Sequence, residues 1–284
     1  MSSIAIITDT DSSLSAELAA QYGIRQVPIT IQFGSDTFDA STLSDSELFE
    51  RIDKAGKLPT TAAPSPGKFT EAYRDAFDAG AEQIVCLCVS SEISATYTSA
   101  LTACAEFPGR DITVVDTRTL TIGQGLMAIA AAQAAREGLS VAECVARAES
   151  LAPRTHLFAA LATLKYLAMS GRVGHLAAGM ATLLSVKPIM TIRDGKLDML
   201  ERVRTHGKSW ARVIELAQET SAGHAFEQMS IVHTTTPAEV RAFEAQLRAS
   251  LPCPDSILYA PLGSGLSVHA GSGIVGVAFV LAEE

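Results

Sequence analysis

The segment HAGSGIVGVAFVLAEE, residues 269–284, carries a histidine two positions before a glycine-rich turn. The turn places Gly271, Gly273 and Gly276 at the Gly-x-Gly-x-x-Gly spacing of a dinucleotide-binding fingerprint. That fingerprint requires a helix that begins at the glycines, so that the helix N-terminus binds the pyrophosphate. The residues that follow here, IVGVAFVLA, are β-branched and apolar, which indicates a buried strand. We therefore expect no nucleotide site, but a turn that holds His269 at the mouth of an apolar cavity.

Hydroxyl side chains are concentrated in four short segments: TDTDSS (8–13), PTTAAPSP (59–66), SSEISATYTS (90–99) and DTRTLT (116–121). Each segment is expected beside a strand end or a helix start, at the sheet edge where open α/β folds bind ligands. Hydroxyls and helix N-termini suit an anionic head group such as a carboxylate or a phosphate. Any one of these residues could be a simple cap or turn residue, but four such loops at one edge favour an anion site.

Two enzyme-like patterns lack the context that they require. Ser94, Asp116 and His269 could form a hydrolase triad, but no Gly-x-Ser-x-Gly elbow occurs in the sequence. The segment GKS at 207–209 resembles the end of a phosphate loop, but Arg202 stands where that loop needs a glycine.

Two arginines are candidates for anion recognition. Arg172 lies between two glycines in SGRVG, and Arg204 lies in RVRT at the end of a predicted hairpin. Arginine matches the geometry of carboxylates and phosphates, and neighbouring glycines allow a close approach. The alternative is that both are ordinary surface residues.

The composition limits the class of protein. The chain has 284 residues, of which 48% are hydrophobic and 19% charged, which predicts a large core and two domains. The net charge of -9 argues against nucleic acid or an anionic membrane bound through a broad basic face. We expect no integral membrane segment, because no run reaches the roughly 18 apolar residues of a spanning helix, and no signal peptide, hence a cytoplasmic protein. The five cysteines form no Cys-x-x-Cys pair, which favours reduced thiols over a zinc site.

The first half of the chain alternates strands with helices four times. The expected strands are IAIIT (4–8), VPITIQF (27–33), IVCLCV (84–89) and ITVVD (112–116). Because these strands are continuously apolar, the pattern predicts an N-terminal α/β domain over residues 1–155, with a Rossmann-like parallel sheet wrapped by helices. For the first helix, Asp11, Ser12 or Ser13 is the expected cap. For the helix after PTTAAPSP, we expect Ser65 as the cap and Pro66 in the first turn.

The pattern changes after residue 155. The segment 186–205 is typical of a hairpin that turns at Asp194-Gly195, and helices and strands then follow in irregular order. This half is predicted to be a C-terminal α+β domain, residues 156–284, with a mainly antiparallel sheet.

Taken in order, these segments resemble the DegV family, the fatty-acid-binding proteins that serve as lipid-carrying subunits of bacterial fatty acid kinase. The resemblance covers nearly the whole chain and rests on IITDTDSSL, TTAAPSP, SSEISATYTSA, VVDT, LKYLAMSGRV, LLSVKPIM, RVRT and VHAGSGIVGVAF. The chain departs from the family pattern at Thr10 (usually serine), Ala62, Ala63, Ala95 (usually glycine), Ser170 (usually glycine) and Ser272 (usually proline).

The resemblance implies a lipid tunnel between or within the two domains and a role for individual residues. The residues implied to bind the fatty-acid carboxylate are Thr61, Ser94, Arg204 and His269. Arg172 is implied to lie near the head group, on the surface that meets the kinase. Residues implied to lie near the head group or to support its loops are Thr10, Ala62, Ala95, Asp116, Gly271 and Gly273.

The implied function is that of a carrier rather than an enzyme. A long-chain fatty acid such as palmitate, stearate or oleate would be bound without any cofactor and presented to the catalytic subunit of an ATP-dependent fatty acid kinase. The product, an acyl phosphate, would serve acceptor enzymes of phospholipid synthesis. Burial of the tail stabilises such a complex by about 0.8 kcal/mol per methylene, before ordering costs.

Two alternatives stay open at this point. One is an acyl-ester hydrolase that uses Ser94 and His269. The other is a regulatory or scaffold protein whose bound lipid is only structural.

Overall fold

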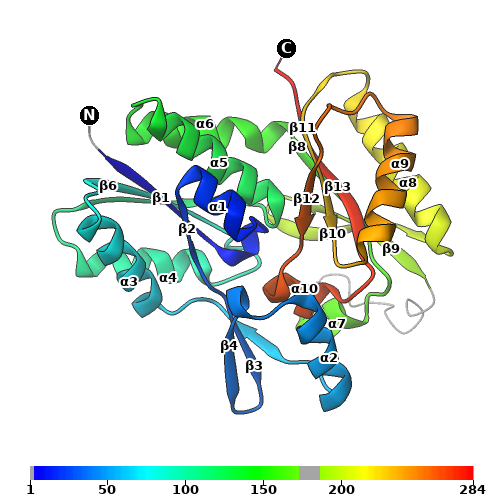
Figure 1. The fold of residues 1–284 in the computed structure, drawn as a ribbon, viewed down its shortest axis with the longest axis horizontal. Helices are drawn as coiled ribbons and strands as arrows, with labels where there is room; N and C mark the ends of the chain where they lie inside the picture. Colours follow the sequence, from blue (N-terminus) through cyan, green and yellow to red (C-terminus); the bar gives the residue numbers. More distant parts are fainter. Residues whose placement is uncertain (1–2, 173–185, 284) are drawn as a thin grey trace. The chain divides into compact units, whose positions relative to one another are not determined.

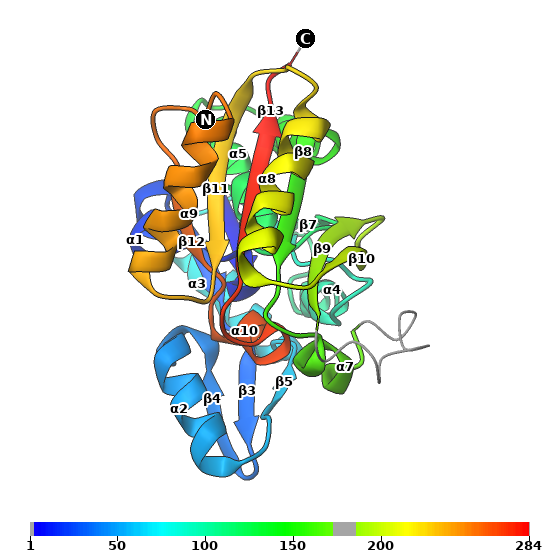
Figure 2. The same cartoon turned by 90° about the vertical axis from the view of Figure 1, so that its right-hand side faces the viewer.

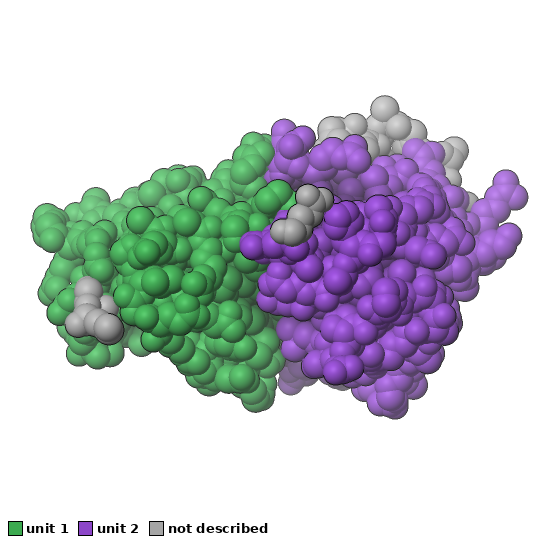
Figure 3. All heavy atoms as spheres, turned by 90° about the horizontal axis from the view of Figure 1, so that it is seen from above, with its two compact units in different colours: residues 1–43, 61–153 green, residues 44–60, 154–284 purple. Residues whose placement is uncertain are grey.

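The computed structural model describes residues 3–172 and 186–283 and divides the chain into two compact units (Figures 1 and 3). The first unit comprises residues 1–43 and 61–153, and the second comprises residues 44–60 and 154–284. The prediction took both domains as continuous in sequence, with a boundary at residue 155, whereas the structure assigns residues 44–60 to the second unit. Parts of the predicted motifs LKYLAMSGRV and LLSVKPIM lie outside the described residues.

The sheet of the first unit is parallel and has the order β2-β1-β6-β7. Its strands are β1 (Ile4–Asp9), β2 (Ile24–Val27), β6 (Gln83–Cys88) and β7 (Asp111–Asp116). Its helices are α1 (Ala16–Tyr22), α3 (Pro66–Asp78), α4 (Thr96–Ala103), α5 (Ile122–Arg136) and α6 (Val141–Leu151). Helices α1, α5 and α6 cover one face of the sheet and α3 and α4 the other (Figure 1). The predicted parallel sheet wrapped by helices is therefore confirmed.

The predicted strand 27–33 is wrong as a single element. Strand β2 ends at Val27, and a new strand, β3 (Thr30–Phe33), begins after Pro28. Proline has no N–H to donate to a ladder, so it interrupts strand pairing. Strand β3 joins a separate sheet of order β4-β3-β5, with β4 (Asp36–Asp39) and β5 (Thr60–Ala62).

The helix starts are partly as predicted. Ser65 caps α3 with Pro66 in the first turn, which confirms that prediction. The predicted cap of the first helix is wrong, because residues 10–12 form a separate 3₁₀ turn and Ser15 caps α1 by accepting a hydrogen bond from the Leu18 N–H. Ser13, which follows the 3₁₀ turn, has a φ of 52° and breaks the helical path.

Helix α2 (Asp45–Ala55) explains why residues 44–60 belong to the second unit. Its start is a capping box, in which the Ser44 side chain accepts from the Glu47 N–H and the Glu47 side chain accepts from the Ser44 N–H. The helix buries Leu48 and Ile52 and packs against helix α10 (Ser264–Ala270) of the second unit. Residues 44–60 belong to the second unit because of this packing, which the periodicity of the helix does not reveal.

The second unit contains a six-stranded sheet of order β10-β9-β8-β13-β11-β12. The strands are β8 (Thr155–Ala160), β9 (Lys187–Arg193), β10 (Lys196–Val203), β11 (Phe226–His233), β12 (Leu258–Pro261) and β13 (Val275–Leu281). Pairing is antiparallel throughout, except between β11 and β12, which confirms the predicted mainly antiparallel sheet. The predicted hairpin is also confirmed, since Asp194 and Gly195 have φ angles of 51° and 80°, as a tight hairpin turn requires.

The core of the second unit lies between its sheet and two long helices. Helices α8 (His206–Ser221) and α9 (Pro237–Ser250) pack against each other and against strands of the sheet (Figure 2). Strand β13 is buried over Val275–Val280, as the run of β-branched and apolar residues predicts. Trp210 of α8 contacts Phe243 of α9 edge to face, with 5.5 Å between the ring centroids. No helix of the described residues is long and apolar enough to cross a membrane.

Candidate functional site

In the first unit, a buried carboxylate joins the loops at the carboxyl ends of the strands. Asp9, the last residue of β1, accepts hydrogen bonds from the N–H groups of Asp11 at 2.9 Å and Val89 at 2.8 Å. It also accepts from the Gln124 side chain of α5 at 2.9 Å. Burial raises the pKa of Asp9 from 3.8 to about 6, although these hydrogen bonds oppose the rise. Asp9 thus ties the TDTDSS loop to the loop after β6, which leads to Ser94.

A second carboxylate, Asp116 at the end of β7, orients the same serine loop. Its oxygens accept from the Ser91 N–H at 3.1 Å, from the Ser91 hydroxyl at 2.6 Å and from the Arg118 N–H at 3.0 Å. Thr10 plays a similar local part, because its hydroxyl accepts from the Ile29 N–H at 3.0 Å. These contacts are what loop-supporting residues would make.

Ser94 lies half-buried just before α4. Its hydroxyl bonds the Thr96 hydroxyl at 2.8 Å and accepts from the Thr96 N–H at 3.3 Å. Ala95 has a φ of -76°, which any residue adopts, so alanine replaces the family's glycine here without strain. Because the hydroxyl pairs with another hydroxyl, the local geometry of Ser94 does not favour the hydrolase alternative.

Thr61 is the middle residue of β5 and is half-buried, with Ala62 exposed beside it. The strand leads through the buried Pro64 to Ser65, the cap of α3. The segment TTAAPSP therefore joins a strand, which was not predicted, to the predicted helix N-terminus.

In the second unit, His269 lies in the last turn of α10, and not on the glycine turn as predicted. Burial lowers the pKa of His269 from 6.5 to about 4, and the positive charge of Arg172 contributes in the same direction. The two predicted residues are therefore close enough to interact electrostatically, and the helices that carry or precede them, α10 and α7, pack together. At neutral pH the imidazole is uncharged and lies near a guanidinium, a setting in which an incoming carboxylate would be stabilised by both groups.

The three glycines after His269 have a packing explanation. Gly271 has a φ of 82°, and a Cβ atom there would lie 2.4 Å from Cδ2 of Tyr166. Gly273 has a φ of 78°, and a Cβ atom on Gly276 would lie 2.5 Å from the Phe158 carbonyl oxygen. Residues 275–281 then form β13, so no helix begins at these glycines. The glycines serve tight packing, and the strand predicted after them is confirmed.

Thr234 is a residue that the sequence argument missed. It follows β11 and is bonded through its side chain and backbone to the glycine turn 37 to 40 positions later. It belongs to no motif or periodic pattern, so only the folded contacts identify it.

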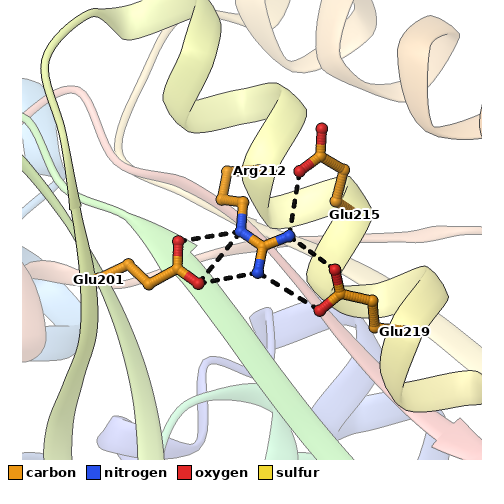
Figure 4. Close-up of polar contacts among 4 residues, drawn as sticks. All are labelled: Glu201, Arg212, Glu215 and Glu219. Atoms are coloured by element: carbon orange, nitrogen blue, oxygen red, sulfur yellow. Dashed lines mark hydrogen bonds and ion pairs between the residues drawn. The ribbon is translucent and has the colours of Figure 1, made fainter.

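Arg204 is exposed and follows β10 directly. No ion pair to Arg204 is found within residues 3–172 and 186–283. The strand that leads to it is fixed to α8 by Arg212, whose guanidinium lies among Glu201 of β10, Glu215 and Glu219 (Figure 4). The Arg212–Glu201 pair is bidentate, with N–O distances of 2.8 and 2.9 Å, and it lowers the pKa of Glu201.

Arg172 is exposed after the end of α7 (Lys165–Ser170), where its guanidinium donates to the Ser170 carbonyl at 2.6 Å. Over the described ranges, no group of three histidine, cysteine, aspartate or glutamate side chains could hold a metal ion. Thr61 and Ser94 belong to the first unit, and Arg204 and His269 to the second. A single carboxylate network formed by all four stays a prediction.

Comparison with known proteins gives one family over almost the whole chain. The profile of a family described as "Uncharacterised protein, DegV family" matches residues 3–282. A DegV domain-containing protein of Deinococcus radiodurans is 35% identical over 277 residues, which cover 97% of this chain and 98% of the relative.

The solved structures that the chain resembles are also DegV family proteins. A DegV family protein of Thermus thermophilus, described by its fatty acid binding, superposes with a TM-score of 0.90 at 28% identity, covering 98% of this chain and 99% of that one. A Bacillus subtilis protein described as "DegV, a fatty acid binding protein" superposes with a TM-score of 0.88 at 24% identity, over 99% of this chain and all of that one.

Proposed function

Because the chain belongs to the DegV family, and its relative from Thermus thermophilus is described by fatty acid binding, we propose that it binds a long-chain fatty acid. The proposed ligands of the carboxylate are Thr61, Ser94, Arg204 and His269. The observation that carries the proposal is the setting of His269, a half-buried and neutral imidazole near Arg172 at the end of a short helix.

The chemistry of these groups suits a carboxylate. Two hydroxyls and an imidazole N–H donate hydrogen bonds, and a guanidinium supplies charge and further donors. Hydrogen bonds to a charged partner contribute more than neutral ones, about 1.5–3 kcal/mol each. Apolar burial of the tail, at about 0.8 kcal/mol per methylene, supplies most of the gross affinity, and the polar groups fix which end lies where.

The carrier would present its ligand rather than transform it. A fatty acid kinase would transfer the γ-phosphoryl group of ATP to a carboxylate oxygen, with ADP as the leaving group and an acyl phosphate as the product. That product is an activated acyl donor for phospholipid synthesis. We assign the chemistry to the kinase, and to this chain the binding of palmitate, stearate or oleate in the cytoplasm without a cofactor.

Arg172 is proposed to meet the kinase, on the basis of its exposure and its place near His269. If so, Arg172→Ala reduces acyl-phosphate formation with a partner kinase more than it reduces fatty-acid affinity. An equal loss in both measurements would instead assign Arg172 to fatty-acid binding alone.

The test of fatty-acid binding begins with the lipid itself. Purified protein is denatured and extracted with organic solvent, and mass spectrometry of the extract is expected to show a roughly stoichiometric long-chain fatty acid. An empty extract, together with no uptake of added oleate or palmitate, would refute the proposal.

The site is tested by calorimetric titration of delipidated protein with oleate. Thr61→Ala and Ser94→Ala are each expected to weaken binding by roughly tenfold or more, because each removes a hydrogen bond to a charged group. Thr98→Ala, which removes an exposed hydroxyl of α4, is the matched control and should bind like the wild type.

A further inference from the structure

Thr234 is bonded to the turn after His269 by four hydrogen bonds. Its hydroxyl donates to the Gly271 carbonyl at 2.9 Å and accepts from the Ile274 N–H at 3.0 Å. Its backbone N–H donates to the Ile274 carbonyl, and its carbonyl accepts from the Gly273 N–H, both at 3.0 Å. The side chain is buried, so the bonds are shielded from competing water. Thr234 therefore fixes both ends of the segment from Gly271 to Ile274.

This segment is where the helix of His269 meets the helix that leads to Arg172. Gly271 lies against the ring of Tyr166 so closely that no side chain would fit between them. Tyr166 belongs to α7, which packs against α10 and ends just before Arg172. The position of Gly271 thus influences how α10 and α7 pack, and with them the separation of His269 and Arg172.

Two of the four hydrogen bonds depend on the Thr234 hydroxyl, and the other two are made by its backbone. Ser230 lies on β11, the strand that Thr234 follows, and is also buried, yet its hydroxyl has no hydrogen-bond partner among the described residues. A hydroxyl that is buried in this region therefore does not always form a hydrogen bond, as Ser230 shows. The Thr234 hydroxyl, in contrast, serves as donor and acceptor to two separate residues of the turn.

We propose that Thr234 is a positioning residue of the carboxylate site, whose hydroxyl holds the Gly271 turn so that His269 stays near Arg172. This inference deepens the proposed fatty-acid function and rests on it. Thr234 itself contacts no ligand in this account, because it acts through the turn.

The decisive variants are Thr234→Val, which keeps the shape and removes the hydroxyl, and Thr234→Ser, which keeps the hydroxyl. Ser230→Ala is the matched control on β11. Two readouts are compared: the titration of His269 by NMR in delipidated protein, and the Kd for oleate at neutral pH.

In Thr234→Val, we expect the His269 pKa to move upward, toward its ordinary value, because a loosened turn admits water to the imidazole. The Kd for oleate should rise about tenfold, as for the loss of one buried hydrogen-bonding group. Thr234→Ser and Ser230→Ala should retain both wild-type values. A folded Thr234→Val protein with wild-type titration and Kd would overturn the proposal.

The experiment also gives a clear answer if the wild type binds no oleate or if Thr234→Val does not fold. If wild-type protein binds no oleate, the proposed function fails, while the His269 titration still reports whether Thr234 positions the imidazole. If Thr234→Val does not fold, Tyr166→Ala frees the same turn from its other side and must also raise the His269 pKa. An unchanged titration in Tyr166→Ala would then refute the positioning role.

Discussion

The low pKa of His269 makes a quantitative prediction about stability. In the unfolded chain this imidazole titrates near 6.5, whereas in the folded protein its pKa is about 4. Between these values the unfolded state binds more protons, so the free energy of unfolding falls as the pH falls. The full difference corresponds to about 3 kcal/mol, which is lost below pH 4 and fully present above pH 6.5. At about pH 4.5 the expected loss is already about 2.5 kcal/mol.

The assay is urea unfolding of delipidated protein at pH 7 and at about pH 4.5. His269→Gln removes the titrating group, so the variant should lose less stability between the two pH values than the wild type, by about 2.5 kcal/mol. Other titrating groups are shared by both proteins and cancel in this comparison. His224→Gln, at an exposed histidine, is the control and should keep the wild-type dependence. Equal pH dependence in His269→Gln and the wild type would refute the burial argument.

Three further predictions concern the supports of the site. Asp9 has a raised pKa, so its contribution to stability increases as the pH falls from about 6 toward 3.8, and Asp9→Asn should abolish that increase in pH-dependent unfolding. Gly271→Ala should destabilise the protein by about 2 kcal/mol or more in urea unfolding, because the methyl group meets Tyr166 and φ is positive; Tyr166→Ala in the same protein should recover part of the loss. Arg212→Ala should cost about 1 kcal/mol at low salt and less at high salt; a cost that does not change with salt would contradict an ionic contribution.

Local signals in the sequence predicted much of the fold. Periodicity gave the long helices and apolar strands, the Asp194-Gly195 pair gave the hairpin, and Ser65 with Pro66 gave the start of α3. These features depend on contacts within a few residues, so a short window of sequence contains the information. The same holds for β13, whose apolar run excluded a dinucleotide turn.

The errors arose where distant contacts decide the structure. Helix α2 lies within the range predicted as the N-terminal domain, yet it belongs to the second unit, because its packing against α10 joins residues more than 200 positions apart. Helix α10 was missed, since its seven residues are too few to show a period. Thr234 was missed because its partners are some 40 positions away and threonine after a strand is usual.

Asp9 and His269 show how shifted pKa values can have different meanings. Burial suppresses the charged form of both side chains. Asp9 already accepts hydrogen bonds from Val89 and Gln124, so its carboxylate is satisfied within the fold and serves the structure. His269 instead lies beside a positive charge, so its charged form is opposed by burial and by Arg172 alike. An incoming carboxylate would reverse both effects, raising the His269 pKa and taking up protons as it binds. Because an added anion would stabilise His269 more than Asp9, we propose that His269 binds the carboxylate and that Asp9 supports the neighbouring loops.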